Sequence, residues 1–405
     1  MARTFLQMLS LVAIIWLQSI NGTNSNFPAY SSQLKHLLSI SQIQLNNLAF
    51  ASDAGKLFGW LSGIAANYLP MWLVLIIGSA LGLIGYGVQY LFLIGHVSNL
   101  SYAAIFFLTV LAGNSICWIN TVCYIVTIGN FPLDRQLAIG LTGSYQGLSA
   151  KIYTDIVEVV FPSSAMERAR AYLILSSVLP FTISVISAPV VRVINVVKTK
   201  RTKAAFILIL IITTATGAFA VVGSLGSAST RLSPLTSAVG MAALLLAPLL
   251  LPLGLVLRQS VPARILNRLK REEKVYVEEI NDASMDNMES GVKEIRESMS
   301  ISSISEDISG GLTESSIGDD NIRETNEIIS VMEEIGVKVM LRRLSFWLYF
   351  FVYLFGVTLG LVFFNNLGQI AESRGCSASA LVSLSSSFGF FGRLVPSIVD
   401  YFFSR

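Results

Sequence analysis

The chain has 405 residues, of which 53% are hydrophobic and only 13% are charged, and its formal net charge is +3. This composition excludes an ordinary set of soluble domains and predicts an all-α, polytopic membrane protein. The basic residues are not interleaved with stacking aromatics, so we expect no nucleic-acid partner. Two histidines and three cysteines offer little material for a metal site, a cofactor or a catalytic centre, and we expect none of these and no enzyme activity.

The charge is concentrated in one segment. Residues 258–343 hold 30 of the 53 charged residues in 86 positions, whereas runs such as Met71–Ile94, Phe206–Val222 and Phe346–Phe364 carry none. Those runs have the length needed to cross the hydrocarbon core of a bilayer. Segment 258–343 opens with basic residues and continues acidic and Ser-rich, a composition that cannot bury enough apolar surface to fold alone. We interpret it as a largely disordered hydrophilic loop between two membrane blocks.

The first apolar run, Phe5–Ile20, follows Arg3 and has the charged start and apolar centre of a signal peptide. No small-residue cleavage site follows, which favours an uncleaved first membrane helix. We expect this helix to continue through Asn21 toward Phe27, with polar groups at membrane depth turned to the protein interior.

The predicted spans total about ten. Residues 1–195 form a six-helix bundle, residues 196–257 two further helices, residues 258–343 the hydrophilic loop, and residues 344–405 the first two helices of an incomplete second bundle. After the first helix the expected spans are Gln42–Ala66, Met71–Ile94, Tyr102–Ile128, Arg135–Val160, Ala171–Ile194, Phe206–Ser224, Ser237–Leu257, Phe346–Phe364 and Ala380–Phe402.

The orientation follows from the basic loops. Lys198, Lys200, Arg201 and Lys203 form a short positive cluster, which the positive-inside rule places in the cytoplasm. Counting spans from this loop puts the loop at Arg135, the basic opening of the hydrophilic segment and both chain ends on the cytoplasmic side. We therefore expect a multi-pass protein of the plasma membrane or an endomembrane, with its N-terminus and central loop in the cytoplasm.

Small residues recur along several spans. Gly140, Gly143 and Gly147 in the fifth span are three or four residues apart, a spacing that lets helix backbones approach closely. The pattern favours a packed bundle, although glycine is also frequent in membrane helices in general.

Ionisable and amide side chains within the second and fifth spans are functional candidates, because polar groups are costly in a bilayer. Asp53 and Lys56 are three apart and Lys151 and Asp155 four apart, so each pair can meet on one helix face. Both pairs also lie near span ends, where long side chains reach water without any further role. The predicted substrate pathway consists of Gln18, Asn21, Asp53, Lys56, Tyr145, Gln146, Lys151 and Asp155.

Three stretches carry a family resemblance. NFPAYSSQLKHLLSISQIQLNNLAFASDAGKLFGWLSG at Asn26–Gly63 and NFPLDRQLAIGLTGSYQGLSAKIYTDI at Asn130–Ile156 resemble plant nodulin-like proteins of the major facilitator superfamily, including the nuclear fusion defective type. NNLGQIAESRG from Asn365 and FGFFGRLVPSIVD ending at Asp400 do so too. The stretches occur in family order, so the resemblance covers essentially the whole chain.

The resemblance implies a facilitator-type fold, with a transport pathway between two six-helix bundles and a Gly-and-Asp/Arg loop that latches their cytoplasmic ends. The corresponding gate candidates are Gly59 and Gly63 in a first copy without charges, and Gly392, Arg393 and Asp400 in a second copy. The family would have about six helices after the loop, where this sequence has two. This difference favours a truncated gene model or splice product.

The leading hypothesis is a secondary transporter of a small organic solute that works by alternating access. The solute would be anionic if Lys151 faces the pathway. The alternative is a non-transporting membrane protein whose cytoplasmic loop serves regulation or docking. The lipid bilayer is the one certain partner, and the sequence leaves the substrate and the oligomeric state open.

Overall fold

The computed structural model describes residues 2–161, 164–194, 203–225, 233–254 and 336–403. The chain divides into two units, Met1–Pro252 with Met332–Arg405, and Leu253–Val331. The second unit lies almost wholly outside the described residues. The disorder predicted for the hydrophilic loop concerns the same residues, and the basic residues at 198–201 also lie outside the described part of the chain. All the described helices belong to the first unit.

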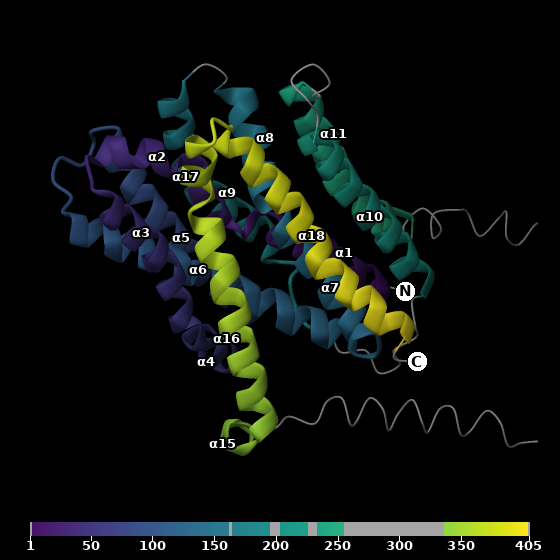
Figure 1. The fold of residues 1–405 in the computed structure, drawn as a ribbon. Coiled ribbons are helices and arrows are strands. Elements are labelled where there is room, and N and C mark those ends of the chain that lie inside the picture. The colour runs from purple at the N-terminus through teal and green to yellow at the C-terminus, as the bar shows by residue number, and fades with distance from the viewer. Residues whose placement is uncertain (1, 162–163, 195–202, 226–232, 255–335, 404–405) are drawn as a thin grey trace, which may run out of the picture. The chain divides into compact units, whose positions relative to one another are not determined.

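Every regular element in the described part of the chain is helical (Figure 1), as the sequence predicts. The elements are α1 (Ala2–Ile20), η1 (Thr23–Asn26), α2 (Phe27–Leu38), α3 (Gln42–Gly55), η2 (Lys56–Gly59), α4 (Trp60–Tyr68), α5 (Met71–Leu93), α6 (Tyr102–Asn130), η3 (Pro132–Asp134), α7 (Arg135–Gly147), α8 (Ser149–Val160), α9 (Ala165–Ser187), α10 (Lys203–Leu225), α11 (Pro234–Leu246), η4 (Ala247–Leu249), α15 (Val337–Arg342), α16 (Leu344–Asn365), α17 (Leu367–Ser373) and α18 (Ala378–Phe403).

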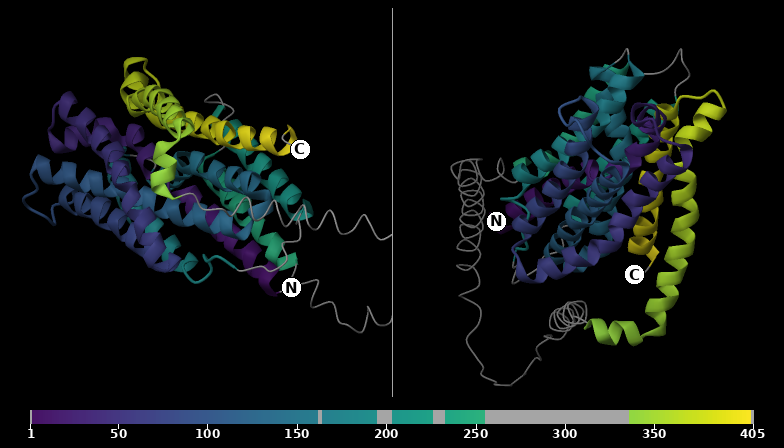
Figure 2. Two further views of the ribbon diagram at one scale, coloured as in Figure 1. Left: turned by 90° about the horizontal axis from the view of Figure 1, so that it is seen from below. Right: turned by 90° about the vertical axis from the view of Figure 1, so that its left-hand side faces the viewer.

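Within these residues, eight helical stretches are long and apolar enough to cross a membrane. Two more stretches, Gln42–Tyr68 and Arg135–Val160, run through predicted spans two and five but are too polar to count among the eight. The protein is therefore an integral, multi-pass membrane bundle. The start of α1 and the end of α18 lie on the same side of the first unit (Figures 1 and 2).

The prediction of one continuous first helix toward Phe27 was wrong. α1 ends at Ile20, the 3-10 turn η1 begins at Thr23, and α2 carries the chain on to Leu38. Asn21 and Gly22 are weak helix formers, and Pro28 in the first turn of α2 suits a new helix start. The fifth span is also interrupted, at Leu148 between α7 and α8.

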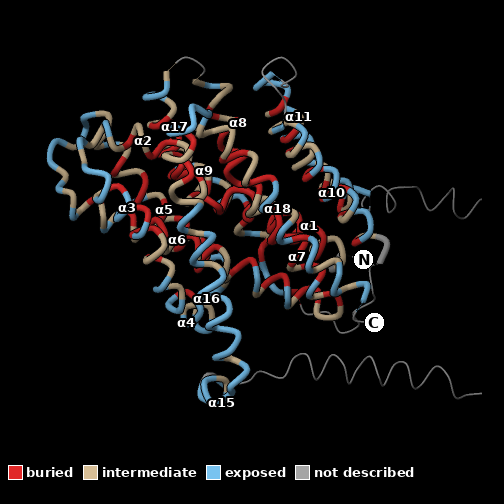
Figure 3. The backbone as a smooth tube through the Cα atoms, in the orientation of Figure 1, coloured by how far each residue is buried: buried red, intermediate tan, exposed pale blue. Residues whose placement is uncertain are grey.

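The core lies around α1. In an apolar 18-residue window of the stretch Thr4–Leu38, 78% of the residues are buried. In the corresponding window of α16 no residue is buried. Figure 3 shows the contrast between red segments of α1 and α8 and the pale blue α16. Since exposed apolar side chains meet lipid in a membrane, α16 is a peripheral helix and α1 a central one.

Close helix packing depends on glycine at specific contacts. At Gly147 of α7, an added Cβ would lie 2.6 Å from the backbone nitrogen of Phe390 in α18, whereas at Gly143 it would meet nothing within 4 Å. At Gly113 of α6 it would lie 1.9 Å from the carbonyl oxygen of Ser52 in α3. The predicted close approach of backbones is therefore confirmed at Gly147 but does not involve every glycine of the pattern.

Candidate functional site

Two helix interruptions meet at the centre of the first unit. Asn21 follows α1, and its side-chain nitrogen donates to the carbonyl of Ile116 (3.1 Å) and to Asn120 Oδ1 (2.9 Å) in α6. The backbone nitrogen of Gly22 donates to Ser149 Oγ (3.0 Å), next to the break between α7 and α8. The Ser149 hydroxyl satisfies the Gly22 backbone nitrogen, which the break frees, and α6 satisfies the Asn21 side chain. The breaks are thus built into a polar layer shared by three helices.

Gln18 lies one turn before this break and is fully buried. Neither its amide nitrogen nor its amide oxygen has a hydrogen-bond partner among the described residues. Gln18 lies in the last turn of α1, just before Asn21, which bonds to α6, and Gly22, which bonds to α8. Burying an amide without a partner costs roughly 2–7 kcal/mol, so this position is expensive unless water or a ligand reaches it.

Lys151 and Asp155 form a buried ion pair on α8, with 2.5 Å between Lys151 Nζ and Asp155 Oδ1 and side chains that are each 5% exposed. Ser237 of α11 completes the cluster. Its hydroxyl accepts from Lys151 Nζ (2.9 Å) and donates to Asp155 Oδ2 (3.1 Å). The four-residue spacing predicted this pair. The pairing also neutralises the Lys151 cation within the protein.

α10 and α18 also contribute to the polar layer. Arg393 in α18 donates to Gln146 Oε1 (2.8 Å), and Ser386 of the same helix bonds to the carbonyl of Gly147. The Tyr145 hydroxyl lies 3.2 Å from Thr213 Oγ1 in α10. The fifth span is therefore bound on several sides, by helices that follow it in the chain.

The second predicted pair is present but lies in a different contact. Lys56 Nζ is 2.6 Å from Asp53 Oδ1, with both side chains partly exposed. Asp53 Oδ2 also accepts from the amide of Asn365 at the end of α16 (2.8 Å). The bond between Asp53 and Asn365 joins α3 to the end of α16, 312 positions away in the chain. The ion pair of Asp53 with Lys56 is not part of the Lys151 cluster.

The gate candidates lie in helices. Gly59 ends η2 and Gly63 lies in α4. Because α4 ends at Tyr68 and α5 begins at Met71, the connection between these two helices consists of Leu69 and Pro70. The expected loop is short because nothing in the segment breaks the helix before Pro70. Gly392, Arg393 and Asp400 all lie inside α18. Of these residues, Arg393 is joined to the predicted pathway through Gln146.

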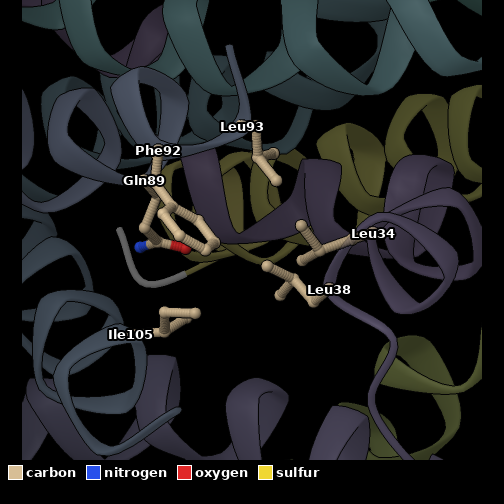
Figure 4. A pocket seen from close by; sticks show the side chains of 6 residues that line it. All are labelled: Leu34, Leu38, Gln89, Phe92, Leu93 and Ile105. Atoms are coloured by element: carbon tan, nitrogen blue, oxygen red, sulfur yellow. The ribbon is translucent and has the colours of Figure 1, made fainter. Parts of the chain in front are cut away.

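A small recess lies apart from the polar layer. It is lined by Leu34, Leu38, Gln89, Phe92, Leu93 and Ile105 (Figure 4), and the space between these side chains does not admit a water molecule. Solute pockets usually measure about 300–1,000 Å³. The Gln89 amide is already bonded to Gly85 and Thr109, so the recess offers a solute little polar recognition. Among the described residues, no group of three or more metal-binding side chains comes together.

Reasoning from sequence alone missed several members of the polar layer. Ser237, Asn120 and Ser386 are small polar residues among other polar residues of mainly apolar helices, which is common in membrane proteins and carries no distinct signal. Their importance depends on which helices touch, and the three residues come from α11, α6 and α18.

Comparison with known proteins agrees with this architecture. The nodulin-like family profile matches residues 7–255. The chain belongs to the nodulin-like family. The profile of the NFD4 C-terminal domain matches residues 328–405, so the two matched regions flank most of the hydrophilic segment.

A curated relative is the Arabidopsis thaliana protein NUCLEAR FUSION DEFECTIVE 4, which is 37% identical over 404 residues. The match covers 98% of this chain and 64% of the relative. No solved structure matches the chain.

Proposed function

We propose that this nodulin-like protein is a secondary transporter, which moves a small organic solute across its membrane by alternating access. The observation that carries the proposal is the buried Gln18 amide, unpartnered among the described residues, beside the interrupted helix α1. Polar groups at membrane depth normally line a substrate or ion path, because they are too costly to retain against lipid. Interrupted membrane helices are likewise typical of transporter binding sites.

The pathway we propose runs along the polar layer between α1, α6 and the α7–α8 break. Gln18 would bind the solute directly, while Asn21 and Gly22 hold the interrupted helix in place through α6 and Ser149. Transport needs these packed groups to separate in turn toward each side of the membrane. The family resemblance to major facilitators supports the same mechanism. No step of the proposal requires catalysis.

The test compares two glutamines of α1. Replacing Gln18 by Leu removes a buried amide that has no partner among the described residues, so the variant should be at least as stable as the wild type. Replacing Gln7 by Leu breaks the bond from Gln7 Nε2 to the carbonyl of Asn130 (3.1 Å) and should lower stability. Thermal denaturation in detergent measures both effects.

Liposomes containing the purified chain are then incubated with a mixture of sugars, amino acids and organic acids, and mass spectrometry identifies the solutes that accumulate. We expect the wild type to accumulate a solute above protein-free liposomes, and Gln18→Leu to lose most of that uptake while keeping its stability. An unchanged uptake in Gln18→Leu would remove Gln18 from the pathway. Absence of any accumulation by the wild type would contradict the transport proposal.

A further inference from the structure

Lys151 and Asp155 of α8 and Ser237 of α11 form one hydrogen-bonded cluster. Asp155 presents one carboxylate oxygen to the Lys151 ammonium (2.5 Å) and the other to the Ser237 hydroxyl (3.1 Å). Lys151 and Ser237 are themselves 2.9 Å apart. An ammonium and a hydroxyl side by side thus form a two-point receptor for a carboxylate, which the side chain of Asp155 fills in this conformation.

A purely structural role explains this cluster poorly. Lys151 and Asp155 lie on the same helix, so their ion pair fixes no contact between helices. Taking both charges out of water is expensive, and apolar residues of similar size often give equal or better stability. Among the described residues, the side chains of the pair bond across helices through Ser237, which a neutral side chain on α8 would bind as well. Charged groups retained at such cost are candidates for function.

Building on the proposed transport function, we propose that Lys151 and Ser237 bind the carboxylate of the solute, and that one proton enters with it on Asp155. The empty site holds one ammonium and one carboxylate, so its net charge is zero. If a solute carboxylate entered while Asp155 stayed ionised, two anions would share one cation in a low-dielectric site. Protonation of Asp155 from the water phase releases Lys151, and the loaded site is neutral again.

The surroundings of Asp155 are compatible with this exchange. The ionisable groups that act on it from its own helix are Lys151 and Glu158. On α9, Tyr172 faces the same region and donates to Thr154, with Arg168 beside it. α11 faces the cluster through the hydroxyl of Ser237.

The other elements packed on α8 add little charge near Asp155. The described side chains that bond to α8 from α18 are hydroxyls, with Ser379 on Glu158 and Ser386 on the Lys151 backbone nitrogen. η1 contains only Thr, Asn and Ser, α7 has Arg135 at its far end, and α1 has only Arg3 near its start. Lys151 is therefore the cation that decides the charge of the site.

The experiment uses acetate as a minimal carboxylate and acetamide as its neutral isostere, with the full 405-residue chain in detergent. Binding is followed by the rise in thermal midpoint at increasing ligand concentration, across the pH range in which acetate itself stays ionised. For the wild type we expect the apparent dissociation constant of acetate to rise about tenfold per pH unit while Asp155 is ionised, as linkage to one proton requires. Acetamide should show no such slope.

Three variants separate this explanation from a structural one. Asp155→Asn should bind acetate with no pH slope, because the lysine is then always available. Ser237→Ala should weaken acetate about tenfold and keep the slope, since one neutral hydrogen bond is lost. The double variant Lys151→Gln with Asp155→Asn keeps an uncharged pair that can fold, and it should lose acetate binding.

Acetate affinity without a pH slope in the wild type, or an unchanged slope in Asp155→Asn, would overturn the proposal. Retained acetate binding in the double variant would do the same. The outcome is distinct from that of the transport assay. Proton-linked acetate binding without uptake of any solute would keep this site and remove transport, whereas uptake without it would keep transport and remove this site.

Discussion

Replacing Lys151 by Gln tests how far the buried pair depends on charge balance. The substitution leaves Asp155 with the Ser237 hydroxyl as its remaining described partner, in a site where both paired side chains are 5% exposed. Removing one partner of a buried ion pair typically costs about 3–5 kcal/mol, because the other charge stays buried without compensation. We expect a loss of stability of this size at neutral pH. The penalty should shrink in acid, where Asp155 takes up a proton and no longer needs a cation.

Denaturation of the purified protein in mixed micelles measures this loss through the shift of the unfolding midpoint. The double variant Lys151→Gln with Asp155→Asn should recover stability to within about 1 kcal/mol of the wild type, because no unpaired charge remains. Lys35→Gln serves as the matched control, since its bond to Gln42 is exposed and its loss should cost at most about 0.5 kcal/mol. A Lys151→Gln variant as stable as the control, at every pH, would refute this reasoning.

Three further predictions concern packing, contacts and orientation. Gly147→Ala should destabilise the protein by about 1–3 kcal/mol, because its Cβ would meet the backbone of α18, whereas Gly143→Ala in the same helix should be neutral or slightly stabilising. Equal midpoints for the two variants would contradict the close approach of α7 and α18. Asp53→Ala and Asn365→Ala should show a coupling energy of about 1 kcal/mol in a double-mutant cycle, reduced from a fully buried contact because Asp53 is partly exposed. Strictly additive effects would show that this bond contributes nothing. Protease added to sealed right-side-out vesicles should leave segment 258–343 uncut and cut it once the membrane is opened, so cleavage in sealed vesicles would reverse the orientation derived from the basic loops.

Sequence was sufficient for the features that depend on local pattern. Uncharged runs of membrane length predicted the apolar spans, and spacings of three and four residues predicted both ion pairs. The periodicity of a helix is enough for these conclusions, because the partners lie on one face of the same element.

Features that depend on tertiary contacts could not be predicted in this way. At the interruption, Ser149 accepts from the freed backbone nitrogen of Gly22 and α6 binds the Asn21 side chain, from positions about a hundred residues away. Ser237 follows a second hydroxyl residue, Thr236, in a mainly apolar helix, and the packing of α11 on α8 brings it to the ion pair. Helix propensity depends on the local sequence and predicts neither contact.

The central claim is that the buried polar layer around Gln18 becomes a water-accessible pathway, open to each side of the membrane in turn. The direct measurement is labelling of Gln18→Cys, in a chain whose Cys117, Cys123 and Cys376 are replaced, by a membrane-impermeant thiol reagent added to either side of sealed vesicles. Alternating access predicts labelling from both sides, with protection when a transported solute is present. A cysteine at this position that reacts from neither side would contradict the pathway, and would leave Gln18 as a buried side chain of the helix packing.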